Sequence, residues 1–297
     1  MNAKPLTYSK SHAVDKIILI GLGAVTLASL FPFYYVFILS FAGYKEFVNQ
    51  SLYILPYSFD ISIYLFLFST QSIVRAVIVT VCITIIGCAF NMFMTVTFAY
   101  GMAKKKMPGR KLIMGLVLFT MFFGGTLISY FLTIKTLGLM NSFWVMILPT
   151  GLSVWYFLIM KNYFQTIPDS LEESAKIDGA NDLLILLKII LPVSTPVLAS
   201  IGLFYAVERW NEWWSAMLFI NNVKYKPLQL LLRETISSVV ANIPNADARD
   251  SIMKDKPLNI PSLKAAMVII TVTPIMLAYP FIQKYFATGI MIGSIKE

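Results

Sequence analysis

Side chains able to perform covalent or metal chemistry are scarce in this sequence. It contains a single histidine, His12, and two cysteines, Cys82 and Cys88. Six positions apart on a helix, the two thiols point in well-separated directions, so small apolar fillers are the simpler interpretation. The pattern G-x-x-x-x-G-K-[ST], whose loop cradles ATP phosphates, does not occur. We therefore expect this chain to contain no catalytic constellation and no metal site, and to hydrolyse no ATP.

Polar chemistry is concentrated instead in the stretch 167–192. Two pairs of residues there have the spacing of a capping box, so a helix is expected to begin at them: Asp169 with Glu172, and Ser170 with Glu173. Gly179 can adopt the left-handed conformation that ends a helix. Asn181 or Asp182 can cap a second, leucine-rich helix that stops at Pro192. Two short helices with a sharp bend suit a rigid docking knob or an amphipathic connector on a membrane surface equally well.

The composition defines the setting of these residues. Of 297 residues, 58% are hydrophobic and 13% are charged, and the mean hydropathy is +0.73. A soluble domain is about 45–50% apolar and about 25% charged. These values argue against a soluble enzyme, a disordered chain and a disulfide-stapled scaffold. The net charge of +9 is better explained by membrane topology than by nucleic-acid binding.

Long windows without Asp, Glu, Lys or Arg locate the membrane spans. Each is close to or longer than the roughly 20 residues that cross the hydrocarbon layer as a helix. Helices are expected because every backbone amide in lipid must be bonded within its own segment. We predict an all-α integral membrane protein with a single domain, 1–297, and six spans at about 17–42, 76–103, 112–134, 143–160, 193–219 and 264–286.

Basic residues set the predicted orientation. They crowd the connection between the second and third spans, whereas the first and third connections carry one lysine each, Lys45 and Lys135. The positive-inside rule then places that connection, the loop after Lys161 and both termini in the cytoplasm. The loop 221–261, external in this topology, carries several basic residues and opposes the assignment, although acidic residues lie among them. The crowded connection contains Lys104, Lys105, Lys106, Arg110 and Lys111.

A family signature distinguishes between the two interpretations of 167–192. Glu173-Ser174-Ala175, followed after three residues by Gly179 and after nine more by Ile189-Ile190-Leu191-Pro192, closely resembles the EAA signature of permease subunits of ABC importers. Ser174 replaces the usual alanine, which is a small-for-small change. In that family the loop is a cytoplasmic coupling helix, here between the fourth and fifth spans, that docks on the ATPase subunit. The resemblance implies coupling roles for Glu173, Ser174, Ala175, Asp178, Gly179 and Ala180.

The resemblance extends over nearly the whole chain. Three segments are similar to carbohydrate-uptake permeases of the maltose-transporter class: 124–128, 137–144 and the Trp210-Asn211-Glu212-Trp213-Trp214 run. The ending, 279–293, is similar to the LplC/YtcP-like branch, which handles complex oligosaccharides. The resemblance implies a type I ABC importer permease fold and a translocation path for oligosaccharides. An importer of peptides or amino acids is the alternative, and a non-ABC transporter is a weaker one.

The same resemblance implies partners and cofactors. The chain binds no cofactor itself, because ATP and Mg belong to two ATPase subunits. A second permease subunit completes the membrane pathway as a heterodimer, and an extracellular solute-binding lipoprotein delivers the substrate. The complex is expected in the bacterial plasma membrane. For the acidic residues Glu173 and Asp178, helix capping and dipole complementarity are the alternative to coupling.

A second polar cluster lies near the outer end of the fifth predicted span. Ionisable residues at membrane depth are costly and indicate a lumen or a partner. Sugars suit aromatic rings for stacking and amide or carboxylate groups for hydrogen bonding, so we predict that Glu208, Trp210 and Asn211 line the substrate path. The alternative is an interfacial aromatic belt with snorkelling charges, which Trp213 and Trp214 fit better.

Overall fold

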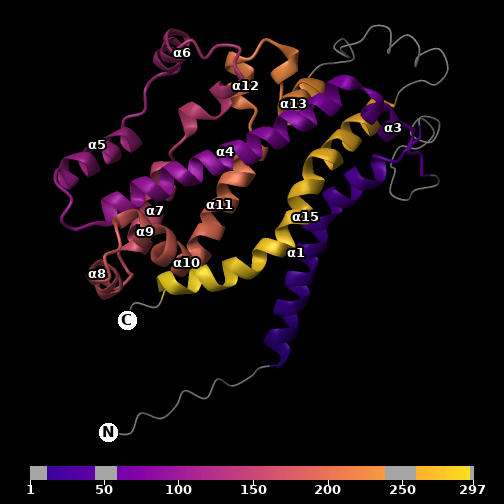
Figure 1. Cartoon of the computed structure of the whole chain (residues 1–297). Coiled ribbons are helices and arrows are strands. Elements are labelled where there is room, and N and C mark those ends of the chain that lie inside the picture. The colour runs from indigo at the N-terminus through magenta and orange to yellow at the C-terminus, as the bar shows by residue number, and fades with distance from the viewer. Residues whose placement is uncertain (1–11, 44–58, 238–258, 295–297) are drawn as a thin grey trace. The chain divides into compact units, whose positions relative to one another are not determined.

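Helices are the only regular secondary structure in residues 12–43, 59–237 and 259–294, the part of the chain that the computed structural model describes (Figure 1). This confirms the prediction of an all-helical chain. The helices separate into two compact units. The first comprises Met1–Leu67 and Asn245–Ile270, and the second comprises Phe68–Pro244 and Thr271–Glu297. One permease domain over 1–297 remains a prediction.

The first unit contains α1 (His12–Leu39) and the beginning of α15 (Ile260–Ser294). Apolar side chains of α1 are open to the surroundings, with Ile17 at 69% and Leu27 at 72% exposure, as a lipid-facing helix requires. Hydrogen bonds gather where α1 ends. The Tyr64 hydroxyl, on α3 (Ser62–Ser69), donates to Ser40 Oγ at 2.7 Å, and Ser262 Oγ donates to the Ala42 carbonyl at 2.9 Å.

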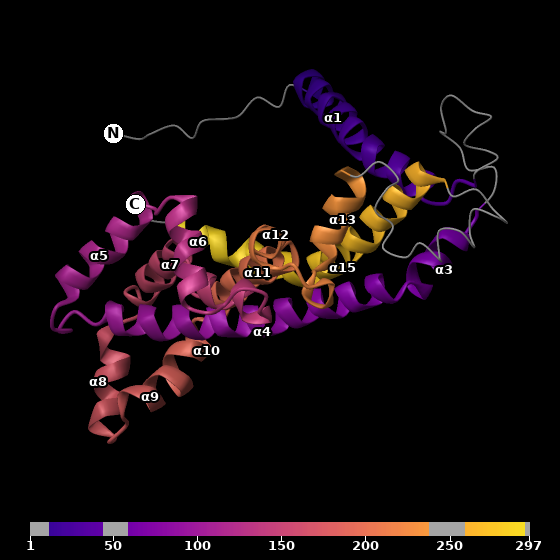
Figure 2. The same ribbon diagram turned by 90° about the horizontal axis from the view of Figure 1, so that it is seen from above.

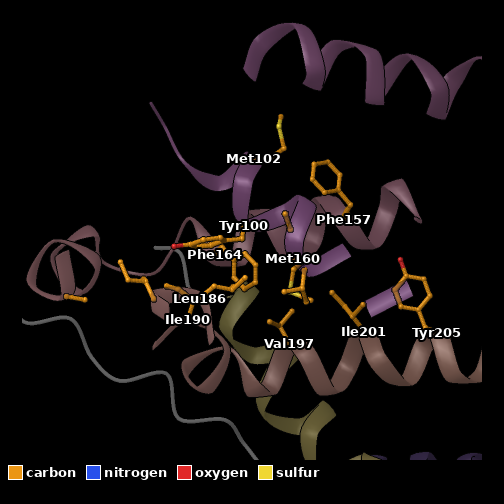
Figure 3. Close-up of a cluster of buried hydrophobic side chains, with 14 residues drawn as sticks. Tyr100, Met102, Phe157, Met160, Phe164, Leu186, Ile190, Val197, Ile201 and Tyr205 are labelled. Atoms are coloured by element: carbon orange, nitrogen blue, oxygen red, sulfur yellow. The ribbon is translucent and has the colours of Figure 1, made fainter. Parts of the chain in front are cut away.

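The second unit is built around α4 (Gln71–Ala103), the longest unbroken helix of this unit. Helices α7 (Val154–Phe164) and α11 (Thr195–Trp210) lie along α4 (Figures 1 and 2). Buried residues of the three helices form one apolar cluster over the C-terminal half of α4 (Figure 3). This cluster includes Tyr100, Met102, Phe157, Met160, Phe164, Val197, Ile201 and Tyr205.

A second apolar cluster covers the N-terminal half of α4. Val79 and Ile83 pack there against Phe219 of α12 (Trp214–Phe219) and Ile134 of α6 (Leu127–Thr136). The short helices η1 (Phe143–Met146) and α13 (Leu228–Ser237) complete it, and η4 (Val223–Tyr225) precedes α13. The backbone N–H of Leu228 donates to Thr80 Oγ1 at 2.8 Å, which fixes the start of α13 on α4.

Breaks at glycine or proline interrupt the third and fourth predicted spans and precede the fifth. The third divides into α5 (Arg110–Phe122) and α6, which meet at 118° around Gly124-Gly125. The fourth is η1 and η2 (Leu148–Thr150) followed by α7, bent by 47° beyond Pro149. The fifth begins after a bend of 87° between α10 (Leu191–Val193) and α11, which carry Pro192 and Pro196.

Within the described residues, three unbroken helices are long and apolar enough to cross a membrane: 15–39, 71–103 and 260–278. The number rises to six if each bent pair is one span. Proline removes a backbone donor and glycine lacks the side chain that restricts the backbone, so both break a helix that apolar composition alone would continue.

Candidate functional site

Helices α8 (Asp169–Ile177) and α9 (Asp182–Ile185) protrude from the second unit at the end where α4 finishes (Figures 1 and 2). The chain continues from α9 through a π-helical turn, η3 (Leu186–Ile190), into α10. Helix α8 begins at Asp169, as predicted, but the capping box does not form: Pro168 is the N-cap residue and offers no side-chain acceptor. The carboxylates of Asp169 and Glu172 instead bind lysines at the end of α4.

The bend between α8 and α9 follows the prediction in detail. Gly179 has a φ of +82°, and no heavy atom lies within 4 Å of the position a Cβ would take. Glycine is therefore needed here for backbone conformation rather than for space. The N–H of Ala180 donates to the Ala175 carbonyl at 2.9 Å, which closes the helix end. Asn181 Oδ1 then accepts from the N–H of Leu184 at 2.8 Å and caps α9.

The six residues with predicted coupling roles divide between two faces. Ala175 is 9% exposed and belongs to the apolar cluster on α4, and Ala180 packs against that cluster. Glu173, Ser174, Asp178 and Gly179 lie on the exposed surface. The small side chain at 175 therefore brings α8 close to this subunit's own core, where Leu186 and Ile190 also pack (Figure 3).

The exposed face of this protrusion also carries apolar side chains that the sequence reasoning did not single out. Ile177 is 87% exposed and Leu183 is 63% exposed. They lie on either side of the bend at Gly179, beside the acidic residues. Isolated exposed apolar side chains are ordinary, but here they flank the signature residues on a protruding surface. Their places in the sequence, next to Asp178 and Asp182, are the signal that could have identified them.

Lysines at the end of α4 hold α8 in place. Lys104 Nζ forms an ion pair with Glu172 Oε2, and it lies 3.8 Å from Asp182 Oδ1 of α9. Burial lowers the pKa of the Lys104 ammonium, but the hydrogen bond with Glu172 opposes this, and the net effect raises the pKa above its ordinary value. A raised pKa favours the charged form of the Lys104 ammonium. Lys105 binds Asp169 at 2.8 Å, and that hydrogen bond lowers the pKa of the Asp169 carboxyl.

The predicted substrate-path residues lie in three different environments. Glu208 is exposed and accepts a hydrogen bond from the Tyr156 hydroxyl at 2.5 Å, and the Tyr156 ring stacks on Phe204 at 5.7 Å. Asn211 is also exposed, and its Oδ1 accepts from Gln229 Nε2 at 2.7 Å. Trp210 is 9% exposed, and its indole N–H donates to the Thr271 carbonyl at 2.9 Å.

Arg209 follows Glu208 in the polar cluster near the outer end of the fifth predicted span, and its side chain is buried. Instead of snorkelling outward with Glu208, it is 6% exposed and points into the second unit. Its Nη1 donates to the Met146 carbonyl at 2.8 Å and to Thr150 Oγ1 at 2.7 Å. Glu212 Oε2 lies 3.8 Å from the same nitrogen.

Three side chains form hydrogen bonds with backbone groups at the break in the segment before α7. Arg209 binds the Met146 carbonyl, and Asn91 Nδ2 donates to the Thr150 carbonyl at 2.6 Å. The Tyr205 hydroxyl accepts from the Ser153 N–H at 3.1 Å. Backbone groups freed by a helix break in an apolar layer are costly unless they find such partners. The helix break is therefore stabilised by hydrogen bonds from α4 on one side and from α11 on the other.

These observations define a class before any comparison with other proteins. The chain has apolar, partly broken membrane helices and a protruding pair of short helices. No group of three or more metal-ligating side chains occurs among the residues with assigned structure. Apolar membrane helices with breaks are typical of membrane transport components.

The chain belongs to the family of binding-protein-dependent transport system inner membrane components, which matches residues 95–292. It is 41% identical over 287 residues to the polygalacturonan/rhamnogalacturonan transport system permease protein YtcP of Bacillus subtilis (strain 168), covering 97% of this chain and 99% of that protein. It is 39% identical over 276 residues to Protein LplC of the same organism, covering 93% and 91%. These matches confirm the predicted LplC/YtcP-like branch.

A solved structure supports the same assignment. The chain superposes with a TM-score of 0.87 and 30% identity on a chain of a bacterial ABC transporter involved in the import of the acidic polysaccharide alginate, covering 95% of this chain and 100% of that one. The fold is the type I permease fold. The protein is a non-catalytic, multi-pass permease subunit, and its family implies a partner permease, ATPase subunits and a solute-binding protein in general.

We predict that Arg209→Met lowers the thermal stability of the purified subunit strongly. The substitution leaves the Glu212 carboxylate, whose side chain is 9% exposed, without its cation. Breaking a buried ion pair by removing one partner costs about 3–5 kcal/mol. Arg209→Met combined with Glu212→Gln should recover part of this loss, because the buried charge is then gone. A thermal melt in detergent measures both variants, and equal melting temperatures for the single and double variants would contradict the ion-pair account.

Proposed function

We propose that this protein is the permease subunit of an ATP-driven importer of oligosaccharides, which forms the translocation path with a second permease. The observation that carries the proposal is the match, over nearly its whole length, to a permease named for polygalacturonan and rhamnogalacturonan. The structural likeness to an alginate importer chain supports it, because both names describe acidic polysaccharides. The alternative is an importer of the same family whose substrates are peptides or amino acids.

In the proposed topology the six spans are those predicted from the sequence. The bent pairs 110–136 and 143–164 provide the third and fourth spans, and the fifth begins after the 87° bend between α10 and α11. The protrusion made by α8 and α9 then faces the cytoplasm. Both chain termini are expected on the same side and the loop 221–261 on the outer side; residues 1–11, 238–258 and 295–297 lie outside the described part of the chain. The Lys104–Lys111 connection supports this orientation through the positive-inside rule. The protein then lies in a bacterial plasma membrane, and the solute-binding partner is an extracellular lipoprotein.

We further propose that α8 is the coupling helix and docks on a cytoplasmic ATPase subunit. Two such subunits bind ATP and Mg, and their closure moves the coupling helices of the two permeases together. The division of the signature residues supports this role. Glu173, Ser174 and Asp178 face outward with Ile177, whereas Ala175 fixes the other face of α8 to the membrane helices. Motion of the docked face is thereby passed to the core on α4.

The substrate-path proposal applies best to Glu208. Asn211 is also exposed, but its amide already donates to the Val207 carbonyl at 2.9 Å and accepts from Gln229 at 2.7 Å. Both side chains are exposed polar groups on or just after α11, and Glu208 lies beside the stacked rings of Tyr156 and Phe204. Trp210 contributes through packing, since its indole N–H is already used by the Thr271 carbonyl. An exposed carboxylate beside stacked aromatic rings suits a hydroxyl-rich ligand.

The substrate prediction is tested by ATPase activity of the purified complex in nanodiscs, with its binding protein and a panel of saccharides. We expect stimulation by oligosaccharides, and more by uronic-acid oligomers than by neutral ones. Short peptides serve as the matched negative panel. Stimulation by peptides and by no saccharide would overturn the substrate class while leaving the ABC permease assignment in place.

The coupling prediction is tested by Gly179→Pro. Proline holds φ near −65°, and position 179 requires +82°, so the bend cannot form. We expect the variant to insert normally but to lose uptake and substrate-stimulated ATPase activity. Gly179→Asn is the control, because asparagine tolerates the left-handed conformation and should keep most activity. Full uptake by a normally expressed Gly179→Pro variant would contradict the role of the bend.

A further inference from the structure

A partly buried ion pair joins the end of α4 to α8, and the same lysine lies near an exposed acid of α9. Lys104 is the residue directly after α4, and its ammonium pairs with Glu172 of α8 and lies 3.8 Å from Asp182 of α9. It also lies over the Tyr100 ring, 4.2 Å from the ring centroid. The Lys104 and Glu172 side chains are 26% and 23% exposed. Lys104 therefore pairs with an acid on one side of the bend at Gly179 and lies near a second acid on the other side. Asp182 is 64% exposed, and its nearer cation is Lys176 of α8 at 3.2 Å.

The end of α4 is itself firmly held. Arg110 Nε donates to the Met102 carbonyl at 3.1 Å, and Gln165 Nε2 donates to the Ala103 carbonyl at 3.4 Å. These bonds occupy carbonyl groups that a helix leaves unpaired at its C-terminus. Lys104 thus projects from a fixed point, and a shift of α8 acts on α4 rather than on a loose loop.

The neighbouring lysine provides a natural comparison. Lys105 binds Asp169, which lies on α8 like Glu172, at a distance of 2.8 Å. The Lys105 and Asp169 side chains are 69% and 71% exposed. Exposed ion pairs are screened by water and salt and contribute little. Lys104 differs from Lys105 in three ways. It is less exposed, it lies near a second carboxylate, that of Asp182, and it lies over the Tyr100 ring. The two adjacent lysines make the same kind of bond with α8 but in different environments.

We propose that Lys104 is a positioning residue for coupling: it transmits displacement of α8 and α9 to α4, and Lys105 does not. This inference rests on the proposed function, because it assumes that α8 receives motion from an ATPase subunit. It adds a residue from outside the EAA signature to the coupling apparatus. It also gives Lys104 a role besides that of a positive-inside signal.

The test compares Lys104→Met with Lys105→Met in the assembled complex, reconstituted in proteoliposomes with its binding protein. The measured quantity is saccharide imported per ATP hydrolysed, which a merely structural role would leave unchanged. We expect Lys104→Met to lower this ratio at least fivefold while the ATPase subunits stay bound. Lys105→Met should stay within twofold of the unmodified complex, and Lys104→Arg should restore most of the ratio because it keeps the cation.

Equal ratios for Lys104→Met and Lys105→Met would overturn the proposal. Dissociation of the ATPase subunits from Lys104→Met would overturn it too, because the lysine would then serve assembly alone. Failure of the proposed function has a different signature: the unmodified complex hydrolyses ATP but imports no saccharide. In that event, spin labels on α8 and α4 test the proposal without a transport assay. The measured quantity is the change in the distance between the two labels when nucleotide binds. A smaller change in the unmodified complex than in Lys104→Met supports the link, and equal changes contradict it.

Discussion

The structure depends on one constraint, which is that backbone groups in an apolar layer must have hydrogen-bond partners. An unbroken helix meets it alone, as α4 does. The broken segment before α7 cannot pair all of its own backbone groups. Its unpaired carbonyl and N–H groups are bound by Arg209, Asn91 and Tyr205 from two neighbouring helices. The same side chains tie α4, α11 and the broken segment together. A buried arginine in this position is thus explained by the break that it satisfies.

Helix α4 is the shared support of the second unit. Its N-terminal half carries the apolar cluster with α6, α12 and α13, and its C-terminal half carries the cluster with α7, α8 and α11. Ala175 inserts α8 into the latter cluster, and Lys104 adds a shielded ion pair at the helix end. The protrusion is therefore continuous with the membrane core in both packing and charge. This continuity is what a coupling element requires, because a force on its exposed face reaches the helices without a flexible joint.

Much of this arrangement could be predicted from the sequence. Apolar windows indicated the helical class. Gly179 was predicted to form the bend, and Asn181 or Asp182 to cap the helix after it, because these residue types have conformational preferences that act within a few residues. The capping box at Asp169 was wrong because lysines distant in sequence compete for the same carboxylates. The helix breaks and the inward direction of Arg209 depend on partners in other helices, such as the Met146 carbonyl. Tertiary contacts of this kind leave no periodic signal in the chain.

The central claim, that the outer face of α8 docks on an ATPase subunit, is tested most directly by crosslinking. Ile177→Cys, in a chain whose Cys82 and Cys88 are replaced by alanine, would carry a thiol-to-amine crosslinker in membranes that contain the whole complex. Position 177 is 87% exposed, so the label does not disturb the core. Thr136→Cys, an exposed position at the end of α6, is the control. The account predicts crosslinking of the ATPase subunit from 177 and none from 136. Equal crosslinking from both positions, or none from 177 in a complex active in uptake, would contradict it.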